Sequence, residues 1–280
     1  MLRSYLYVPG DKPELIAKAR RLSGVHQPDA LLLDLEDAVA VSQKAVARAN
    51  IAALTASPPS ADGPMLFVRI NAGEVGLADV VAVAGPSLVG VCVPKASTSA
   101  LREVGRVFAE VGLRVAIIAL VETAAGLSEI QNIALSEGVT RLALGEADLC
   151  SELGIASGAN HALWPLRMQA VVASAAAGIE PPIGPISTDF RNLDQFSASS
   201  ELLLQAGFAA RQAIHPAQIS VINQIMQPSA EALAAAAETV ALYDSASTAG
   251  RGVTVDSDGR MLDEAVVRAA RRLLSFVETR

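Results

Sequence analysis

The chain has 280 residues, of which 51% are hydrophobic and only 4% aromatic, and its formal net charge is −7. This is enough apolar material for one large core, whereas the negative charge and the scarcity of aromatic side chains argue against binding to nucleic acid or to an anionic membrane surface. No apolar run approaches the about 20 residues that a membrane-spanning helix needs, and charged residues interrupt any signal-peptide-like segment near the N-terminus. Cys92 and Cys150 lie far apart and form no CxxC motif, so we expect a cytoplasmic enzyme.

Short apolar segments alternate with helical patterns through the first 228 residues. We predict strands near residues 5–8, 30–33, 66–70, 90–93, 115–121, 141–144, 182–185 and 213–214, and helices over residues 13–22, 43–54, 76–83, 99–111, 124–135, 163–177 and 199–205. Strand–helix units in this number and length predict an α/β fold, a (β/α)8 TIM barrel. A doubly wound open sheet is the alternative, but no GxGxxG motif follows the first strand.

The sequence changes character after residue 228. An Ala-rich helix is predicted over residues 229–243, followed by a small-residue linker over 245–252, a short strand at 253–255, a turn at 257–259 and a last helix over 263–277. We therefore expect a barrel over residues 1–228 and a C-terminal helical extension over residues 229–280. The extension could pack on its own barrel or reach a neighbouring subunit as a lid.

Glu122 follows an unbroken run of seven apolar residues, 115–121, which suits a strand that is covered on both faces. In a barrel the carboxyl ends of all strands meet at one rim, where active sites are built. Glu122 is therefore a candidate site residue. A glutamate that starts a helix and is favoured by the helix dipole is an equally good explanation of this one position.

Polar residues follow most of the predicted strands and should share this rim. Glu122 and Asp148 come from adjacent strand ends, and two carboxylates with water and a chelating substrate are a usual way to hold Mg²⁺. Glu146 could be the ligand instead, and Asp148 could merely cap the next helix. The three histidines show no HxH or HExxH spacing, which makes a zinc site improbable. The other polar residues expected at the rim are Lys12, Asp34, Glu36, Asp37, Arg69, Lys95 and His215.

Arg69 could bind an anionic substrate in bidentate fashion, or form a structural ion pair with Asp34, Glu36 or Asp37. Lys95 could do either, although an acidic rim disfavours a Schiff-base lysine. His215, before a proline, could act as a base or position its loop. Covalent triad chemistry is unlikely to operate, because no GxSxG motif or Cys/His pairing is present. Residues 1–21 carry five basic side chains that could form a phosphate-binding patch near the rim, although a solvated helix face is the commoner explanation: Arg3, Lys12, Lys18, Arg20 and Arg21.

Eight short motifs occur in a fixed order along the chain. Together they closely resemble the citrate lyase β-subunit-like branch of the HpcH/HpaI aldolase family, close to the malyl-CoA and citramalyl-CoA lyases. The branch with a catalytic histidine after its second strand fits less well, because this chain has Leu35-Glu36-Asp37 there. The motifs are RSYLYVPG at 3–10, DLEDAV at 34–39, VRIN at 68–71, VPK at 93–95, VETAAGL at 121–127, GEADL at 145–149, TDF at 188–190 and AIHPAQ at 213–218.

The resemblance implies a (β/α)8 barrel, usually a homotrimer or hexamer, that uses Mg²⁺ (Mn²⁺ possible) on a coenzyme A or acyl-carrier-protein thioester. It places the metal ligands on Glu122 and Asp148 and the substrate arginine on Arg69. The segment Gly259-Arg260-Met261-Leu262-Asp263 resembles the lid motif of these lyases, which makes Asp263 the catalytic acid/base delivered to a neighbour's site. An N-cap of the last helix is the alternative role for Asp263.

The implied reaction is the cleavage of a 3-hydroxyacyl-CoA, such as malyl-CoA or citramalyl-CoA, into acetyl-CoA and a 2-oxo acid, or its formation from them. Lys12, Lys95 and His215 would bind substrate, while Glu36 and Asp37 would order the metal's waters or Arg69. The alternatives are the β subunit of a multi-component citrate lyase acting on citryl-acyl-carrier protein, and a malyl-CoA thioesterase. A phosphate-binding barrel isomerase is disfavoured, because the late strands lack a convincing Gly-rich phosphate loop.

Overall fold

The computed structural model describes residues 1–156, 159–248 and 252–278. It divides into two compact units, one of residues 2–226 and one of residues 227–280 with Met1. Each unit is considered by itself. None of the helices in the described part of the chain combines the length and hydrophobicity needed to cross a membrane.

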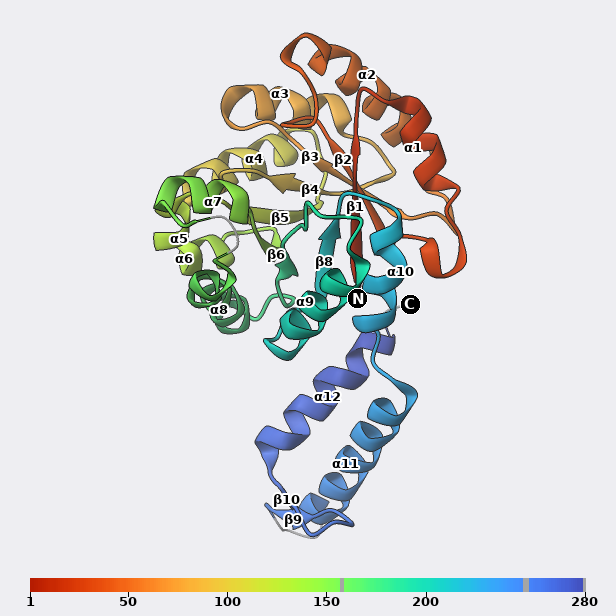
Figure 1. Cartoon of the computed structure of the whole chain (residues 1–280), viewed down its shortest axis with the longest axis vertical. Coiled ribbons are helices and arrows are strands. Elements are labelled where there is room, and N and C mark those ends of the chain that lie inside the picture. Colours follow the sequence, from red (N-terminus) through yellow and green to blue (C-terminus); the bar gives the residue numbers. More distant parts are fainter. Residues whose placement is uncertain (157–158, 249–251, 279–280) are drawn as a thin grey trace. The chain divides into compact units, whose positions relative to one another are not determined.

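The larger unit is a closed barrel of parallel strands in the order β1 to β8, in which β8 pairs back with β1 through Gln212 and Tyr5 (Figure 1). This confirms the predicted (β/α)8 barrel. The strands are β1 (Ser4–Pro9), β2 (Ala30–Asp34), β3 (Met65–Arg69), β4 (Leu88–Val93), β5 (Ala116–Val121), β6 (Val139–Leu144), β7 (Ile183–Gly184) and β8 (Ala210–Ala213).

Helices surround the strands, and the chain follows each strand with a helical connection. The α-helices of this unit are α1 (Pro13–Arg20), α2 (Lys44–Thr55), α3 (Gly73–Val83), α4 (Thr98–Glu110), α5 (Ala124–Ser128), α6 (Ile130–Ala134), α7 (Glu146–Leu153), α8 (Asn160–Ala177), α9 (Leu193–Gln205) and α10 (Ala217–Ile225), and two 3₁₀ turns are η1 (Gly24–His26) and η2 (Val41–Gln43).

The structure departs from the predicted elements in several places of this unit. The helix predicted over residues 124–135 is broken at Glu129 into α5 and α6. Helices α7 and α10 were not among the predicted helices, and α9 begins at Leu193 rather than at residue 199. Strand β8 lies at Ala210–Ala213 rather than at 213–214. The prediction missed its start because strands were predicted from runs of apolar residues, and the polar residues Arg211 and Gln212 interrupt this run.

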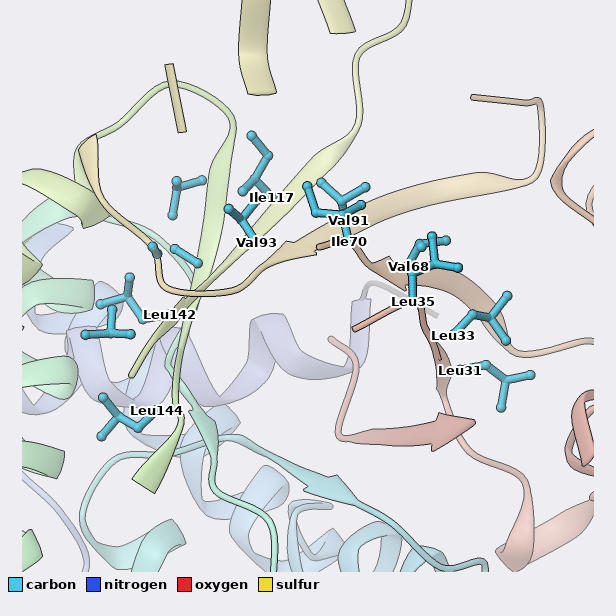
Figure 2. Packing of buried hydrophobic residues seen from close by; sticks show 14 of the residues in the cluster. Leu31, Leu33, Leu35, Val68, Ile70, Val91, Val93, Ile117, Leu142 and Leu144 are labelled. Atoms are coloured by element: carbon cyan, nitrogen blue, oxygen red, sulfur yellow. The ribbon is translucent and has the colours of Figure 1, made fainter. Parts of the chain in front are cut away.

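Side chains alternate between two cores along every strand, as the period of a β-strand requires. One cluster fills the barrel interior and includes Leu32, Phe67 and Leu120. The other packs between the strands and the helices, and Figure 2 shows part of it. The labelled members of this outer cluster are Leu31, Leu33, Leu35, Val68, Ile70, Val91, Val93, Ile117, Leu142 and Leu144.

The alternation decides which side chains reach the carboxyl end of the barrel from inside. Asp34 lies two residues after Leu32 and therefore points inward from β2 as Leu32 does. In the same way Arg69 follows Phe67 on β3, and Glu122 follows Leu120 at the end of β5. The apolar interior rows therefore end in charged groups at the rim where barrel active sites lie.

The smaller unit contains α11 (Ala230–Thr248), the strands β9 (Thr254–Val255) and β10 (Met261–Leu262), and α12 (Glu264–Glu278). The strands form an antiparallel hairpin, and α11 and α12 lie side by side (Figure 1). Arg271 joins the two helices through an ion pair with Asp244 at 2.6 Å. The linker predicted over residues 245–252 is wrong at its start, because α11 continues to Thr248. Residues 249–251 of that linker lie outside the described residues. Strand β10 was not predicted.

Candidate functional site

The inward rows of β2 and β3 end in an ion pair between Asp34 and Arg69. Arg69 Nε donates to Asp34 Oδ1 and Arg69 Nη2 donates to Asp34 Oδ2, both at 2.6 Å. Asp34 is fully buried, and its carboxylate also accepts hydrogen bonds from the main-chain N–H groups of Glu36 and Ala38 at 2.9 Å. This bidentate pair fixes the plane of the guanidinium.

Two further carboxylates approach the remaining edge of the Arg69 guanidinium. Nη1 lies 2.9 Å from Glu36 Oε2 and 3.3 Å from Asp37 Oδ2, and the guanidinium carbon lies 5.0 Å from the centre of the Tyr7 ring. Burial is the largest single influence and opposes the charge on Arg69, but the hydrogen bonds to Asp34 and the negative charge of Asp34 and Glu36 together exceed it and place the pKa of Arg69 above its ordinary value. Arg69 is therefore a fixed cation among three carboxylates.

Lys95 continues this pattern at the end of β4. Its main-chain N–H donates to Glu122 Oε1 at 2.8 Å, while its Nζ donates to Glu36 Oε1 at 3.0 Å and lies 4.0 Å from Glu122 Oε1. The hydrogen bond to Glu36 raises the pKa of Lys95. Lys95 thus contacts Glu122 with both its main chain and its side chain.

Glu122 is only 3% exposed, at the end of β5. Burial raises its pKa from 4.5 to about 7; the nearby carboxylates of Glu36 and Asp148 add to this, and the N–H of Lys95 opposes it. Helix α5 is capped by Thr123, whose Oγ1 accepts from Gly126 N at 3.0 Å. The helix-start explanation therefore does not account for Glu122, since its carboxylate instead accepts from the end of β4.

Gly145 makes room for the Glu122 side chain. A Cβ at position 145 would lie 2.5 Å from Glu122 Cβ and 2.6 Å from Glu122 Oε2, both shorter than real contacts. A residue without a side chain is therefore needed where β6 passes Glu122.

Asp148 lies in the first turn of α7, which begins at Glu146, and so is not the N-cap of that helix. Its side chain is exposed and has no hydrogen-bond or ion-pair partner among the described residues, although its charge acts on Glu122. Glu146 is occupied elsewhere: Arg167 Nε and Nη2 donate to its two oxygens at 2.6 and 2.8 Å. Of these two carboxylates, Asp148 is the one that is available to a ligand.

The charged groups form a chain of alternating sign across the barrel mouth, in the order Asp34, Arg69, Glu36, Lys95 and Glu122. In the described part of the chain, no three His, Cys, Asp or Glu side chains gather into a complete metal cage. Glu122 with Asp148 nevertheless suits Mg²⁺, which takes one or two carboxylates and leaves other positions to water and substrate. Burial is the main cause of the raised pKa of Glu122, and the charges of Glu36 and Asp148 add to it; a divalent cation would offset both, so the residues fit such an ion.

Lys12 and His215 follow β1 and β8 and so belong to the same rim. Among the described residues, no hydrogen bond or ion pair joins them to the series of charged groups from Asp34 to Glu122. Lys12 Nζ pairs with Asp11 Oδ2 at 3.1 Å. The His215 ring stacks on Phe190 with ring centres 4.7 Å apart, and its Nδ1 accepts from Ala217 N at 3.2 Å. Both residues are held locally.

Asp263 belongs to the smaller unit, where it precedes α12. Its Oδ1 accepts a hydrogen bond from Val266 N at 3.0 Å, which is the geometry of an N-cap. The capping role considered from the sequence is therefore present, and it uses one of the two carboxylate oxygens.

The basic residues of positions 1–21 do not form the single patch that was considered from the sequence beside the commoner solvated helix face. Arg3 lies at the amino-terminal end of β1, where its Nε and Nη2 bind Asp29 at 2.9 Å. Helix α1 runs back from the rim, so Arg20 ends it at the opposite face and Arg21 follows it there. Of the five, Lys12 is at the rim, because a strand–helix unit reverses direction between its first and last residues.

Two residues of this site were not among the predicted functional residues, although one signal could have found them. Asp34 was considered only as a partner for Arg69, and Tyr7 was not considered. Stepping by two along β1 and β2 from interior residues reaches Tyr7 and Asp34, so the inward period combined with strand ends identifies both.

Several known proteins are similar to this chain over nearly its whole length. The HpcH/HpaI aldolase/citrate lyase family matches residues 3–216. Two proteins of one Cereibacter sphaeroides strain are similar: a (3S)-malyl-CoA thioesterase, 31% identical over 99% of this chain and 94% of its own length, and an L-malyl-CoA/beta-methylmalyl-CoA lyase, 29% identical with the same coverage. The crystal structure of CitE from Mycobacterium tuberculosis with magnesium, acetoacetate and coenzyme A superposes with a TM-score of 0.75 and 29% identity, over 98% of this chain and 97% of that one. The chain therefore belongs to the HpcH/HpaI aldolase/citrate lyase family.

Proposed function

We propose that this chain is a Mg²⁺-dependent carbon–carbon lyase that cleaves, or in reverse forms, a 3-hydroxyacyl-CoA such as malyl-CoA or citramalyl-CoA, with acetyl-CoA and a 2-oxo acid as the other side of the reaction. The observation that carries the proposal is that three groups share the carboxyl rim: buried Glu122, Asp148 without a partner among the described residues, and a fixed, charged Arg69. The family supports a lyase, and the related proteins support a coenzyme A thioester with magnesium.

Glu122 and Asp148 are the residues that would hold Mg²⁺, or Mn²⁺ with the same oxygen ligands, and the bound ion supplies positive charge that polarises the carboxylate and 2-oxygen of the oxo acid. Arg69 adds a second positive charge that stabilises the alkoxide as it becomes a ketone. Asp34 fixes Arg69 in the orientation needed, and Glu36 and Asp37 hold its outer edge. The cation is therefore positioned before substrate arrives.

Three further residues are assigned to substrate binding. Lys95 presents its ammonium at the mouth, and Lys12 is an exposed cation at the rim that can meet the phosphates of coenzyme A. His215 accepts a hydrogen bond at Nδ1, so a neutral ring carries its proton on Nε2 and can donate it to a carbonyl or carboxylate.

Asp263 is assigned the role of acid/base, removing the hydroxyl proton as the carbon–carbon bond breaks. Its cap occupies Oδ1 and orients the carboxylate, which leaves Oδ2 for the proton. We place it over the site of a neighbouring subunit in a homotrimer or hexamer, with residues 229–280 acting as the lid. Asp263→Asn should keep the cap and the binding of a 2-oxo acid but lose turnover by about 100-fold or more; unaltered turnover would leave Asp263 only its capping role.

Two rival activities use the same site. A malyl-CoA thioesterase would release free coenzyme A, and one related protein carries that name. The β subunit of a multi-component citrate lyase would act on citryl-acyl-carrier protein and would be inactive alone. The intact lid motif at residues 259–263 favours a stand-alone enzyme acting on coenzyme A esters.

A direct assay separates these activities. The purified protein is incubated with Mg²⁺, acetyl-CoA and glyoxylate, pyruvate or oxaloacetate in turn, and the new thioester and free coenzyme A are quantified by chromatography. Formation of a 3-hydroxyacyl-CoA that EDTA abolishes supports the lyase. Release of free coenzyme A from added malyl-CoA, with no acetyl-CoA formed, indicates the thioesterase. No reaction with either set of substrates until an acyl carrier protein is added indicates the complex subunit.

We also propose a cytoplasmic location. Cys92 is buried inside the barrel and Cys150 is half-buried, and both are free thiols, as expected in a reducing compartment. Recovery of the protein with the soluble cytoplasmic fraction of its native cells would test this.

A further inference from the structure

Lys95 has a backbone conformation that side chains rarely adopt. Its φ is 46°, and among the residues that the structure describes it is the one non-glycine residue with a positive φ. This left-handed region costs free energy for a residue with a Cβ and is cheapest for glycine. In this conformation the Lys95 N–H meets Glu122 Oε1 at 2.8 Å. Glycine would allow the same hydrogen bond with less strain, so the lysine side chain needs an explanation of its own.

The side chain of Lys95 places an ammonium against two carboxylates. Its Nζ lies 3.0 Å from Glu36 Oε1 and 4.0 Å from Glu122 Oε1. A positive charge this close to Glu122 stabilises the carboxylate when no metal is bound, and it repels a second cation that approaches the same oxygens.

Two other cations near these carboxylates do not have this freedom. Arg69 is locked by its bidentate pair with Asp34, and its side chain is 11% exposed. Lys44 donates to the main-chain oxygens of Leu35 and Glu36 at 2.8 and 3.0 Å and meets neither carboxylate. The Lys95 side chain is 47% exposed, so it can leave the carboxylates without breaking a buried pair.

We propose that Lys95 is a positioning residue with two separable roles: its left-handed main chain fixes Glu122, and its ammonium is an internal counter-ion that weakens divalent-cation binding at Glu122 and Asp148. This rests on the proposed function, because it takes these two residues as the metal ligands. Replacing this charged residue of the site should therefore raise the affinity for the divalent cation rather than lower it.

The test measures cation affinity without substrate and without turnover. Mn²⁺ dissociation constants are determined from the electron paramagnetic resonance signal of free Mn²⁺, and Mg²⁺ by calorimetry, for Lys95→Gln, Lys95→Arg and the wild type. We expect Lys95→Gln to bind either ion about three- to tenfold more tightly, since one charge within about 4–6 Å is removed at high effective dielectric. Lys95→Arg and the matched control Lys18→Gln, an exposed lysine of α1, should stay within about twofold of the wild type.

The main-chain role is tested by a second pair of variants. Lys95→Gly and Lys95→Ala both lose the ammonium, so both should bind Mn²⁺ more tightly than the wild type. Only the glycine variant relieves the left-handed strain, and it should unfold at a higher urea concentration than the alanine variant. Equal midpoints would overturn the main-chain role.

Each remaining result has one meaning. Unchanged or weaker cation binding in a folded Lys95→Gln protein, with wild-type binding intact, overturns the counter-ion role and leaves the proposed lyase standing. A wild-type protein that binds neither Mn²⁺ nor Mg²⁺ overturns both. Circular dichroism of every variant identifies loss of fold, and the Lys95→Gly protein serves if Lys95→Gln does not fold.

Discussion

Two arginines lie on inward-facing rows of the barrel strands, at opposite ends of the barrel. Arg141 of β6 lies near the amino-terminal end, where its side chain is 1% exposed; Nη1 donates to Leu2 O at 2.7 Å and to Tyr5 Oη at 3.2 Å, and Nε lies 2.6 Å from Glu180 Oε2. Arg69 of β3 lies at the carboxyl end and meets three carboxylates.

The difference between the two ends is one of charge balance. Arg141 has one carboxylate, one carbonyl and one hydroxyl, so its buried charge is matched by one opposite charge. At the other end the ion pairs of Asp34, Glu36, Asp37 and Glu122 in the described part of the chain are all with Arg69 or Lys95, and the charge of Asp148 adds a fifth carboxylate near Glu122. A structural ion pair requires balance, whereas an excess of carboxylate over cation is what a metal site shows before the metal binds.

The largest expected effect is on lyase activity, which should depend on Glu122 at the carboxyl end and not on Glu180 at the amino-terminal end. Glu122→Gln should abolish Mg²⁺ binding and lower lyase activity by about 1,000-fold or more, because a ligand oxygen with negative charge is lost. Glu180→Gln, the matched change beside Arg141, should lower stability but leave kcat/KM within a few-fold. Steady-state kinetics and calorimetry measure both. Full turnover of Glu122→Gln, or an equal loss in Glu180→Gln, would break the comparison.

The next effect concerns stability at the carboxyl end. Arg69→Met should lower the free energy of unfolding by about 3–5 kcal/mol, because Asp34 is left fully buried without its counter-charge. The double variant Arg69→Met with Asp34→Leu should recover much of this loss, since no unpaired charge remains, yet stay inactive. Urea unfolding gives the stabilities. A double variant no more stable than Arg69→Met would show that the pair does not set the stability of this end.

The pH dependence of stability should also differ between the ends. The pKa of Glu122 is about 7 in the folded protein against 4.5 ordinarily, so the folded state binds its proton more tightly than the unfolded state does. Its contribution is complete below about pH 4.5 and is lost as the pH rises through 7, a fall of at most about 3 kcal/mol. The wild type in EDTA should therefore lose stability between pH 5 and 8 relative to Glu122→Gln.

Added Mg²⁺ provides the control for this pH effect. The ion requires a deprotonated Glu122, so it should stabilise the wild type more at pH 8 than at pH 5 and should not stabilise Glu122→Gln. Parallel pH profiles for the two proteins in EDTA would show that Glu122 titrates normally.

The smallest effect tests the exposed edge of the cluster. Asp37 is 66% exposed, and its 3.3 Å contact with Arg69 is the most solvent-screened of the three. Asp37→Asn should change the free energy of unfolding by no more than about 0.5 kcal/mol and kcat/KM by a few-fold. A loss as large as that of Arg69→Met would mean that Asp37 is an essential partner of the guanidinium.

Much of the fold could be predicted from the sequence, because long apolar runs and helical periods are local signals. The rim position of Glu122 followed from the run at 115–121, and Arg69 followed from its place at a strand end. What could not be predicted was the choice among partners: Arg69 had three candidate carboxylates, and it contacts all of them.

The other features that could not be predicted share one cause: they depend on three-dimensional contacts that leave no signal in the local sequence. The left-handed backbone of Lys95 and the pairing of Glu146 with Arg167 depend on contacts between segments that are distant in the sequence. The early basic residues looked like one patch because they are close in sequence, but the chain reverses between them. Proximity along a strand–helix unit therefore does not predict proximity in a barrel.

The four hydrogen bonds received by Asp34 have a consequence for ligand recognition. Its Oδ1 accepts from Arg69 Nε and Glu36 N, and its Oδ2 accepts from Arg69 Nη2 and Ala38 N. One buried side chain thereby couples the guanidinium to the loop after β2, so neither can reorient alone. The entropy of ordering this corner is lost when the chain folds, and the mouth behaves as a preorganised receptor that needs little rearrangement to take its ligand.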